Sequence, residues 1–550
     1  MKVEAIETTG ELMNRKLSLP AMVEPVVADL ESMAVSGDSC AECGGKKKVL
    51  TPPITPGPSP PSVPPSTHPK MAPSRVLNIG NINPNLVKAE YAVRGEIASK
   101  SEVYRQQLKD HPNDHGLPFD TVISANIGNP QQLDQKPITF FRQVLSILEY
   151  PALLDVPGDI FPEDVKERAR ALLKEVNSVG AYSQSQGAFG IRKSVANFIE
   201  RRDGFPSDPN DIFLTAGASS GVNVTLNTMC SSKSTGILIP IPQYPLYTAT
   251  LALLDATPIP YHLQEESAWS TNIAELRGII QESRANGIDP RCIVIINPGN
   301  PTGASLNEDD IAAVLKLAAE EHLVVMADEV YQTNVYLGEF HSFKKVLRKL
   351  QASTPVAYDY VELISLHSIS KGMVGECGHR GGYFELTNFD PLVKAQIYKL
   401  VSITLCPPVI GQCLVELMCN PPTSGSPSYE LYRKEYDGIF SGLKSRAQAL
   451  YEAFKDMAGV KCQDPMGAMY LFPTITLPEK AVSAAAEKGK RPDEWYCLRM
   501  LEETGVCVVP GSGFGQKEGT WHFRTTFLAP GTEWVSRVKA FHEGFMKEYA

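Results

Sequence analysis

The sequence CIVIINPGNPTGASLNEDDIAAVLKLAAEEHLVVMADEVY, which spans residues 292–331, decides the fold because it joins two apolar runs through an amphipathic one. The runs Ile293–Ile296 and Leu323–Ala327 are short and continuously apolar, as is typical of strands that are buried on both faces. Between them, residues 305–322 repeat apolar side chains at helical spacing. A strand, a helix and a second strand in succession predict an α/β fold with a mostly parallel sheet flanked by helices.

The same alternation continues on both sides of this stretch and indicates where a ligand would bind. Further short apolar runs predict strands at Ile212–Thr215, Gly236–Pro240, Val361–Leu366 and Gly381–Leu386. Within the helical run, Ser305 and Glu308 have the spacing of a capping box, which predicts a helix that begins at Ser305. Ligands of parallel α/β sheets gather at the carboxyl ends of the strands, so the polar residues that follow each strand are the candidate site residues.

The proline content divides the chain into an extension and a globular part. Residues 51–69 contain nine prolines, a composition that favours extended polyproline II and cannot bury a core. We therefore predict that residues 1–72 form a disordered, Pro-rich extension. For the rest we expect an N-terminal arm and small-domain segment over residues 73–150, a large domain that carries the sheet over residues 151–400, and a smaller C-terminal α+β domain over residues 401–550.

The composition argues against several classes of protein. The chain has 52 Lys and Arg against 62 Asp and Glu, and its net charge of −10 argues against a nucleic-acid partner or an anionic membrane surface. No apolar run approaches the length of a membrane-spanning helix. The eleven cysteines lack the paired spacing of a zinc module, so we predict no metal site. Such cysteine usage suits a reducing compartment, and we expect a cytoplasmic protein.

The first candidate site is the Gly-rich turn Thr215-Ala-Gly-Ala-Ser-Ser-Gly221, which follows a predicted strand and precedes a predicted helix. Backbone N–H groups at the start of a helix, with the hydroxyl of Ser219 or Ser220 beside them, can bind a phosphate. The same residues match the G-x-S-x-G motif of a hydrolase nucleophile elbow, with Ser219 as the nucleophile. On these residues alone, a phosphate site, a nucleophile and a structural turn all stay open.

Other predicted strands are also followed by polar or reactive side chains. Tyr244 lies in a Pro-rich turn where a planar heterocycle could stack on its ring, and Asn297–Gly303 combines turn-forming residues with two amides. Asp328 ends an apolar strand and must find a cation or several hydrogen bonds, because burial of an unpaired carboxylate is unfavourable. Lys371 follows Ser368 near another strand end, and a lysine in a half-dry cleft can form a Schiff base.

This set of features resembles the fold-type I, pyridoxal-phosphate-dependent aminotransferases. The resemblance rests on the Gly-rich turn, on the motifs N-P-x-N-P-T-G, D-x-x-Y and S-x-S-K, and on the later arginines Arg380 and Arg524. It covers nearly the whole chain beyond the Pro-rich extension. Longer stretches that are similar to the alanine aminotransferase branch of this family include Tyr91-Ala-Val-Arg-Gly95, Gly378-His-Arg-Gly-Gly-Tyr383, Leu405-Cys-Pro-Pro408 and Val509-Pro-Gly-Ser-Gly-Phe-Gly-Gln516.

The resemblance implies a role for each residue around the ring of pyridoxal 5'-phosphate, the implied cofactor. Lys371 would hold the cofactor aldehyde as a Schiff base and move the proton of the substrate Cα. Asp328 would pair with the pyridine N–H⁺ and Tyr244 would stack on the ring, so Lys371, Asp328 and Tyr244 form the predicted catalytic set. Asn300 and Tyr331 would hydrogen-bond the phenolic oxygen of the ring.

The resemblance also implies contacts to the cofactor phosphate and to the substrate. The predicted phosphate ligands are Ala218, Ser219, Ser368 and Arg380. Tyr182 would reach the phosphate in the neighbouring subunit, which implies a homodimer with shared sites. Arg524 would bind the substrate α-carboxylate, and the other predicted substrate contacts are Asn300 and Gly128.

Together these expectations describe an enzyme of alanine metabolism. We expect it to convert L-alanine and 2-oxoglutarate into pyruvate and L-glutamate by a ping-pong reaction, with amino and keto acids as its small-molecule partners. Two alternatives stay open at this point. The same scaffold could act as a glutamate:glyoxylate aminotransferase, or the chain could be a non-catalytic, cofactor-binding regulatory protein. A mitochondrial location is the alternative to the cytoplasm.

Overall fold

The centre of the structure is an eight-stranded sheet with the strand order β2-β9-β8-β7-β6-β3-β4-β5. The computed structural model describes residues 77–91, 95–354 and 356–550. Strands β3, β4, β6, β7 and β8 are parallel, whereas β9 is antiparallel to both neighbours and β5 is antiparallel to β4. The strands are β2 (Ile212–Thr215), β3 (Thr235–Ile241), β4 (Thr257–Gln264), β5 (Ser270–Thr271), β6 (Asp289–Ile296), β7 (Val324–Asp328), β8 (Leu363–Ser368) and β9 (Gly382–Thr387).

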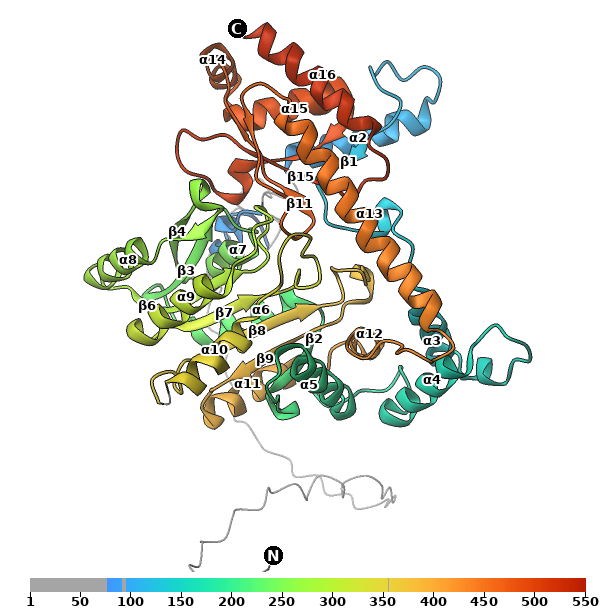
Figure 1. The fold of residues 1–550 in the computed structure, drawn as a ribbon. Coiled ribbons are helices and arrows are strands. Elements are labelled where there is room, and N and C mark those ends of the chain that lie inside the picture. The colour runs from blue at the N-terminus through green and yellow to red at the C-terminus, as the bar shows by residue number, and fades with distance from the viewer. Residues whose placement is uncertain (1–76, 92–94, 355) are drawn as a thin grey trace, which may run out of the picture. The chain divides into compact units, whose positions relative to one another are not determined.

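Helices cover both faces of this sheet, which confirms the predicted mostly parallel α/β fold (Figure 1). Ile293 and Ile295 of β6 belong to the hydrophobic cluster on one face, and Cys292 and Val294 belong to the cluster on the other. The alternation explains why these strands are apolar throughout. One face carries α6 (Ala218–Met229), α7 (Leu246–Leu253) and α11 (Pro391–Ile403), and the other carries α5 (Phe189–Asp203), α8 (Ile273–Ala285), α9 (Glu308–Glu321), α10 (Phe343–Ser353) and α12 (Val409–Cys419).

The start of α9 corrects one expectation from the sequence. The helix begins at Glu308, and its N-cap is Asn307, whose side-chain oxygen accepts a hydrogen bond from the N–H of Asp310 at 2.9 Å. The hydroxyl of Ser305, the expected cap, is buried without a hydrogen-bond partner. Asparagine caps a helix as well as serine does, and a start at residue 308 places three acidic side chains in the first turn.

A second region contains helices and short strands, and it is built from residues that precede the large sheet and residues that follow it. Strand β1 (Ile123–Ser124) pairs in parallel with β13 (Val506–Cys507), so residues before the large sheet join residues after it. A three-stranded sheet has the order β11-β15-β14, and β10 pairs with β12. These strands are β10 (Val460–Lys461), β11 (Tyr470–Leu471), β12 (Thr474–Ile475), β14 (Val509–Pro510) and β15 (Phe523–Thr526).

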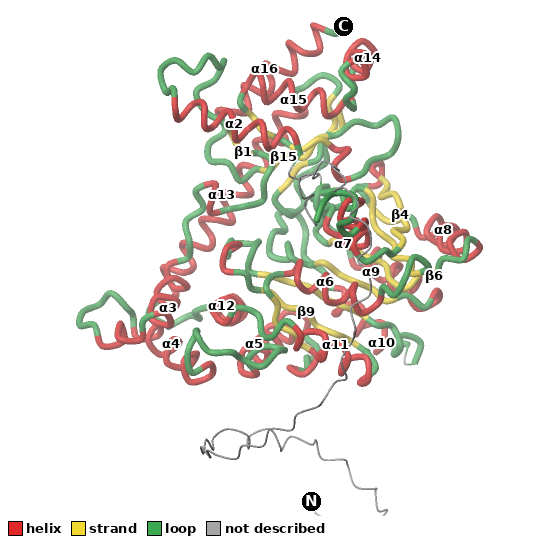
Figure 2. The backbone as a smooth tube through the Cα atoms, turned by 180° about the vertical axis from the view of Figure 1, so that it is seen from behind, coloured by secondary structure: helices red, strands yellow, loops and turns green. Residues whose placement is uncertain are grey.

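Long helices surround these short strands and connect them to the rest of the described chain. Helix α13 (Tyr429–Lys455) contacts β11 and α16 as well as α3, and Figure 1 and Figure 2 both show it running along one side of the structure. The remaining helices are α1 (Pro84–Lys88), α2 (Glu96–Asp110), α3 (Thr139–Glu149), α4 (Glu163–Val176), α14 (Glu479–Glu487), α15 (Pro492–Thr504) and α16 (Glu533–Glu548).

The extension predicted over residues 1–72 lies outside the described residues, and the expected domain boundaries at residues 150 and 400 stay predictions. Within the described ranges, every helix is too short or too polar to cross a membrane.

Candidate active site

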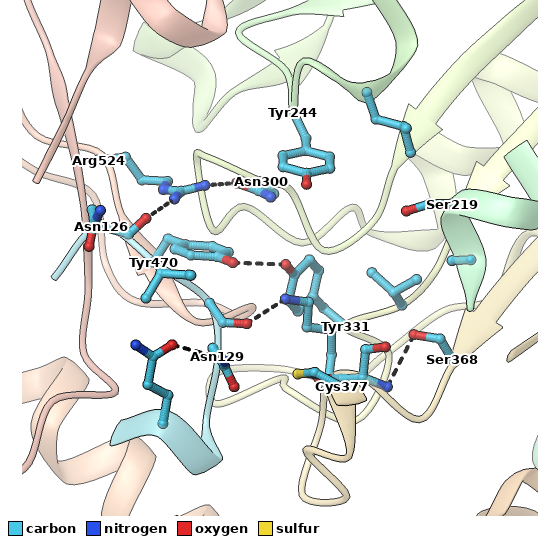
Figure 3. A pocket seen from close by; sticks show the side chains of 18 of the residues that line it. Asn126, Asn129, Ser219, Tyr244, Asn300, Tyr331, Ser368, Cys377, Tyr470 and Arg524 are labelled. Atoms are coloured by element: carbon cyan, nitrogen blue, oxygen red, sulfur yellow. Dashed lines mark hydrogen bonds between the residues drawn. The ribbon is translucent and has the colours of Figure 1, made fainter. Parts of the chain in front are cut away.

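A pocket of about 720 Å³ lies at the carboxyl ends of β6, β7 and β8, where the sequence predicted the site (Figure 3). Residues from the turn after β2, from β11 and from β15 also line it, so the pocket is shared by the large sheet and the C-terminal strands. The predicted residues that line it are Gly128, Ala218, Ser219, Tyr244, Asn300, Asp328, Tyr331, Ser368, Lys371, Arg380 and Arg524.

The Gly-rich turn places a helix start and an arginine together. Gly217 is the N-cap of α6 and has a φ of 91°, a backbone conformation that favours glycine. A Cβ atom at this position would lie 2.5 Å from Nη2 of Arg380, so only glycine lets the arginine approach the turn. Arg380 donates hydrogen bonds to the carbonyl oxygens of Ala216 and Cys377 at 2.9 and 2.8 Å. A helix N-terminus beside a guanidinium group favours an anion.

The same turn does not support the hydrolase interpretation of Ser219. Ser219 lies at the beginning of α6 and lines the pocket, as a nucleophile elbow would also require. A serine nucleophile needs a base within hydrogen-bond reach, usually a histidine. Among the described residues that line the pocket there is no histidine.

Asp328 is a buried carboxylate at the end of β7. One of its oxygens accepts a hydrogen bond from the hydroxyl of Tyr247 at 2.7 Å, and the other accepts from the N–H of Val330 at 3.4 Å. Burial raises the pKa of Asp328 above its usual value, although these hydrogen bonds and the charge of Lys371 oppose the shift. No Lys or Arg within the described ranges forms an ion pair with it. The carboxylate is therefore suited to a cationic group of a ligand.

Lys371 lies next to Gly128, a position at which the pocket has room only for glycine. Its Nζ atom donates a hydrogen bond to the carbonyl oxygen of Gly128 at 2.7 Å and lies 5.9 Å from the centre of the Tyr331 ring. A Cβ atom on Gly128 would lie 3.0 Å from Nζ and 2.0 Å from the Tyr470 hydroxyl oxygen. Glycine at this position therefore leaves room for the lysine amine and for a neighbouring phenol at the same time.

Arg524 is a buried cation without an acidic partner. The residue is 2% exposed, and its Nη1 and Nη2 atoms donate to the side-chain oxygen of Asn300 at 3.0 Å and to the main-chain oxygen of Asn126 at 2.5 Å. Its Nε atom is buried without a hydrogen-bond partner, and no Asp or Glu in the described part of the chain pairs with the guanidinium. A buried charge requires a counter-charge, so this arginine is suited to a ligand carboxylate.

Three residues of the site were not assigned a role from the sequence. Tyr470 of β11 is 2% exposed, its hydroxyl lies 3.1 Å from that of Tyr331, and its ring centre lies 4.3 Å from the guanidinium carbon of Arg524. Tyr247 hydrogen-bonds Asp328, and Asn126 hydrogen-bonds Arg524. Tyr247 lies three residues after Tyr244, in the first turn of α7 (Leu246–Leu253), and this proximity could have identified it. Strand β11 has only two residues and carries no motif.

Tyr244 and Tyr182, two tyrosines predicted to contact the cofactor, lie in different places. Tyr244 lines the pocket, and its hydroxyl forms a hydrogen bond with that of Tyr91, which also lines the pocket. Tyr182 does not line the pocket, and 82% of its surface is exposed in this single chain. An exposed position agrees with the expectation that Tyr182 serves a neighbouring subunit, and that role stays a prediction.

Comparison with known proteins agrees with the fold. Residues 154–537 match the family described as aminotransferase class I and II. The chain is 53% identical over 486 residues to a mitochondrial alanine aminotransferase of Saccharomyces cerevisiae, covering 87% of this chain and 82% of that protein. It is 48% identical to alanine aminotransferase 1, mitochondrial, of Arabidopsis thaliana over 86% of this chain and 88% of that protein.

One further relative is named as inactive, and one solved structure shares the fold. A second Saccharomyces cerevisiae protein, named as an inactive alanine aminotransferase, is 51% identical over 85% of this chain and 94% of its own length. The solved structure of an alanine aminotransferase from Pyrococcus furiosus has a TM-score of 0.65 at 24% identity, covering 85% of this chain and all of that one. The family match over residues 154–537 and the identity to these relatives establish that this chain belongs to the class I and II aminotransferases.

Proposed function

We propose that this protein is a pyridoxal-phosphate-dependent alanine aminotransferase. In two half-reactions it converts L-alanine and 2-oxoglutarate into pyruvate and L-glutamate. The names of the relatives support alanine as the substrate. The observation that carries the proposal is the buried, acid-free guanidinium of Arg524 in the same pocket as Lys371 and Asp328. An inactive protein has no need to maintain a buried cation, because an unpaired buried charge lowers stability.

The donor set of the pocket fits pyridoxal 5'-phosphate. The start of α6 with Ala218, Ser219, Ser368 and Arg380 suits the phosphate. Asp328 lacks the cationic partner that a protonated pyridine nitrogen would provide. When bound, the cofactor supplies an electron sink for the substrate carbon that loses its proton.

The residues around the ring then have separate tasks. Lys371 would hold the cofactor aldehyde, and its Nζ atom, once free, would move the proton between the substrate Cα and the C4′ carbon of the cofactor, a task worth ~10²–10⁴ in rate. Asp328 holds the proton on the pyridine nitrogen. Asn300 and Tyr331 hydrogen-bond the phenolic oxygen, and Tyr244 packs against the ring face.

Substrate binding rests on Arg524 in this proposal. Its unpartnered Nε–H and its two terminal nitrogens can bind the α-carboxylate in a bidentate manner, which a lysine does poorly. Asn300 keeps the guanidinium in place, and the carbonyl oxygen of Gly128 lies next to the lysine amine. Arg524 would thus hold the carboxylate while Lys371, in the same pocket, serves as the proton acceptor.

An absorbance experiment on the purified protein tests the proposal. The protein with bound cofactor is expected to absorb at the violet edge of the visible range, to lose this band with L-alanine and to regain it with pyruvate or 2-oxoglutarate. A band that does not respond to L-alanine would contradict an alanine aminotransferase and would support a non-catalytic protein. Glyoxylate is included as an acceptor, because a faster return with glyoxylate than with 2-oxoglutarate would favour the glutamate:glyoxylate alternative.

We also propose a homodimer in which Tyr182 binds the cofactor phosphate of the neighbouring subunit. The support is its high exposure in the single chain and its location outside the pocket of its own chain. For the location in the cell we propose the cytoplasm, as charge and cysteine usage suggest, with the mitochondrion as the alternative because several relatives are named mitochondrial. Fractionation with an antibody against the chain separates the two locations.

A further inference from the structure

A reaction that uses both alanine and glutamate requires a pocket that accepts two kinds of side chain. The distal carboxylate of glutamate or 2-oxoglutarate carries a charge that alanine and pyruvate lack, and this charge needs a partner once it is removed from water. The basic side chains among the described residues that line the pocket belong to Lys371, Arg380, Arg524 and Arg105. The first three have tasks in the proposed function, and Arg105 does not.

Arg105 is presented to the pocket by α2. Its Nη1 atom forms an ion pair with Glu102, one turn earlier on the helix, and its Nη2 atom donates a hydrogen bond to the hydroxyl of Ser124. The Arg105 side chain is 29% exposed and that of Glu102 is 70% exposed. Both residues line the pocket, as does Ala98 on the same face of the helix. The guanidinium is therefore half-buried with an acidic partner that faces more solvent.

Arg105 and Arg524 both hydrogen-bond the short segment that contains Ser124 and Asn126. Arg105 hydrogen-bonds the side chain of Ser124, and Arg524 hydrogen-bonds the main-chain oxygen of Asn126. Both guanidinium groups also line the same pocket. A dicarboxylate whose carboxyl groups are separated by the α-carbon and two methylene groups could therefore place one carboxylate at each of them.

Helix α2 is well anchored for such a role. Ile97 and Ser101 are buried, and α2 contacts both β13 and α15. Strand β13 pairs with β1, which carries Ser124. The helix that carries Arg105 and the strand that carries its hydrogen-bond acceptor are thus held in one unit, so the guanidinium does not depend on a loop for its position.

We propose that Arg105 binds the distal carboxylate of L-glutamate and 2-oxoglutarate, and that Glu102 neutralises Arg105 when alanine or pyruvate occupies the pocket. The proposal rests on the alanine aminotransferase function proposed above and names the residue that gives it its second substrate pair. Glu102 can leave the guanidinium because its carboxylate is largely exposed and is stabilised by water when it is released. The same pocket thereby accepts a methyl group and a carboxylate without an unpaired charge in either state.

The first test compares the two half-reactions in the variant Arg105→Gln. We expect kcat/KM to fall ~10–100-fold for L-glutamate and 2-oxoglutarate, the effect of one charge-assisted hydrogen-bonded pair, and to change less than about threefold for L-alanine and pyruvate. Arg105→Lys keeps the charge and should recover part of the loss. The matched control is Arg433→Gln, which removes a helical Arg–Asp pair that does not line the pocket. An equal fall for both substrate pairs, or no fall for the dicarboxylates, would overturn the proposal.

The second test does not require turnover. Glutarate, an unreactive dicarboxylate, and propionate, a monocarboxylate, are titrated by calorimetry into the parent and variant proteins with bound cofactor. Arg105→Gln should weaken glutarate binding ~10–100-fold and leave propionate binding unchanged, whereas Glu102→Gln should bind glutarate at least as tightly as the parent. Equal weakening by Glu102→Gln and Arg105→Gln would overturn the proposal.

The two tests also separate this proposal from the function on which it rests. If the parent protein does not transaminate L-alanine but Arg105→Gln still loses glutarate binding selectively, the proposed function is wrong and the carboxylate site stands. If the parent is active and Arg105→Gln keeps its affinity for both dicarboxylates, the function stands and Arg105 is not the distal site. Far-UV circular dichroism and the melting temperature establish that each variant is folded.

Discussion

Several charged residues of the pocket are placed so that a ligand group could become their partner. Among the residues that the structure describes, none forms an ion pair with Arg524 or with Asp328, although these two residues line the same cavity. Lys371 uses a main-chain oxygen as its hydrogen-bond acceptor. Arg524 and Asp328 can each pair with a ligand group of opposite charge, and Lys371 can exchange its acceptor for an aldehyde, which is how a preorganised site gains specificity.

Replacement of Lys371 by alanine should abolish transamination while leaving the fold intact. The variant loses both the amine that binds the aldehyde and the base at the substrate Cα. The measurement is the single-turnover rate with L-alanine, at saturating cofactor, on a protein whose circular dichroism matches the parent. A variant that keeps a rate near that of the parent would show that Lys371 has neither role.

Ser219→Ala serves as the matched control in the same pocket. Loss of its hydroxyl should weaken cofactor affinity by ~1–3 kcal/mol and leave turnover measurable at saturating cofactor. An inactive Ser219→Ala protein with fully bound cofactor would instead support the nucleophile interpretation of the Gly-rich turn.

Tyr470→Phe tests the phenol that the sequence did not identify. Burial by itself would raise the pKa of Tyr470, but the charges of Lys371 and Arg524 and the hydrogen bond with Tyr331 lower it below its usual value. Removal of the hydroxyl leaves the buried Tyr331 hydroxyl without this partner, so we expect a loss of ~1–3 kcal/mol in unfolding free energy and a reduced kcat with L-alanine. Urea unfolding and steady-state kinetics measure the two effects.

Tyr336→Phe provides the control for a buried hydroxyl away from the pocket. The hydroxyl of Tyr336 donates to the main-chain oxygen of Ala468 at 2.9 Å, and Tyr336 does not line the cavity. This variant should lose stability and keep its kcat. Equal kinetic effects in Tyr336→Phe and Tyr470→Phe would show that Tyr470 acts only through stability.

Strand β7 is the element that connects the active site with the layer on the opposite side. Asp328, its last residue, lines the pocket, whereas the next residue, Glu329, accepts a hydrogen bond from the N–H of Phe343 at 2.8 Å at the start of α10. Arg202 of α5 lies 3.9 Å from the Glu329 carboxylate. Two consecutive carboxylates therefore serve a ligand on one side and helix packing on the other, as alternation along an extended chain requires.

Glu329→Gln should change the pH dependence of stability. Burial raises the pKa of Glu329 from its usual 4.5 to about 7, even though Arg202 and the Phe343 N–H oppose the shift. Between these values the folded state holds a proton that the unfolded state has released, so this group makes the parent less stable as the pH rises from about 4.5 to about 7. The full effect amounts to roughly 3 kcal/mol.

The glutamine variant keeps the acceptor for Phe343 and removes the titration. The measurement is the difference in unfolding free energy between parent and variant across this pH range, which isolates the contribution of residue 329. The difference should change in favour of the variant as the pH rises. A difference that does not depend on pH would show that Glu329 stays ionised throughout.

The sequence predicted some elements well for an identifiable physical reason. Strands β2, β7 and β8 are largely buried on both faces, so hydrophobicity marks them within about two residues of their bounds, whereas β6 was predicted only from Ile293 because its first residues alternate between exposed and buried. Strand β4 has alternating burial and two prolines, and it was not predicted. Strands β1, β11 and β13 have two residues each and form through partners far away in the sequence, so no local pattern marks them.

The same distinction applies to the site. Residues that follow the apolar strands, such as Asp328 and Lys371, could be found because strand ends are predictable. Tyr470 and Arg105 reach the pocket from β11 and α2, whose positions depend on long-range packing. The N-cap of α9 was placed two residues too early because Ser305 and Asn307 are both good caps, and local spacing did not distinguish them.

At the scale of the whole molecule, the proposed dimer makes a prediction about mixed subunits. If Tyr182 serves the neighbouring cofactor while Lys371 and Arg524 serve their own chain, homodimers of Tyr182→Phe and of Lys371→Ala are both impaired. Loss of one charge-assisted hydrogen bond at Tyr182 is worth ~1.5–3 kcal/mol. In a heterodimer of the two variants, one site combines an intact Lys371 with an intact Tyr182, so its activity should exceed the mean of the parental homodimers.

The heterodimer is isolated with two different affinity tags, and its specific activity is compared with that of both homodimers purified in the same way. A mixture of parent and Lys371→Ala chains gives the reference for one fully native site per dimer. If the doubly tagged heterodimer has only the mean activity of the two variants, Tyr182 acts within its own chain or not at the cofactor.

The hydrogen bond between Arg524 and the main chain of Asn126 has a consequence for biosynthesis of the enzyme. The two residues are 398 positions apart, and β1 likewise pairs with β13 near the end of the chain. During translation the ribosome has released the strand that precedes Lys371 long before Arg524 is made. A chain that is prematurely terminated or cleaved before residue 524 therefore contains Lys371 but lacks Arg524, which lines the same pocket. The pocket is completed only when the C-terminal strands have been synthesised.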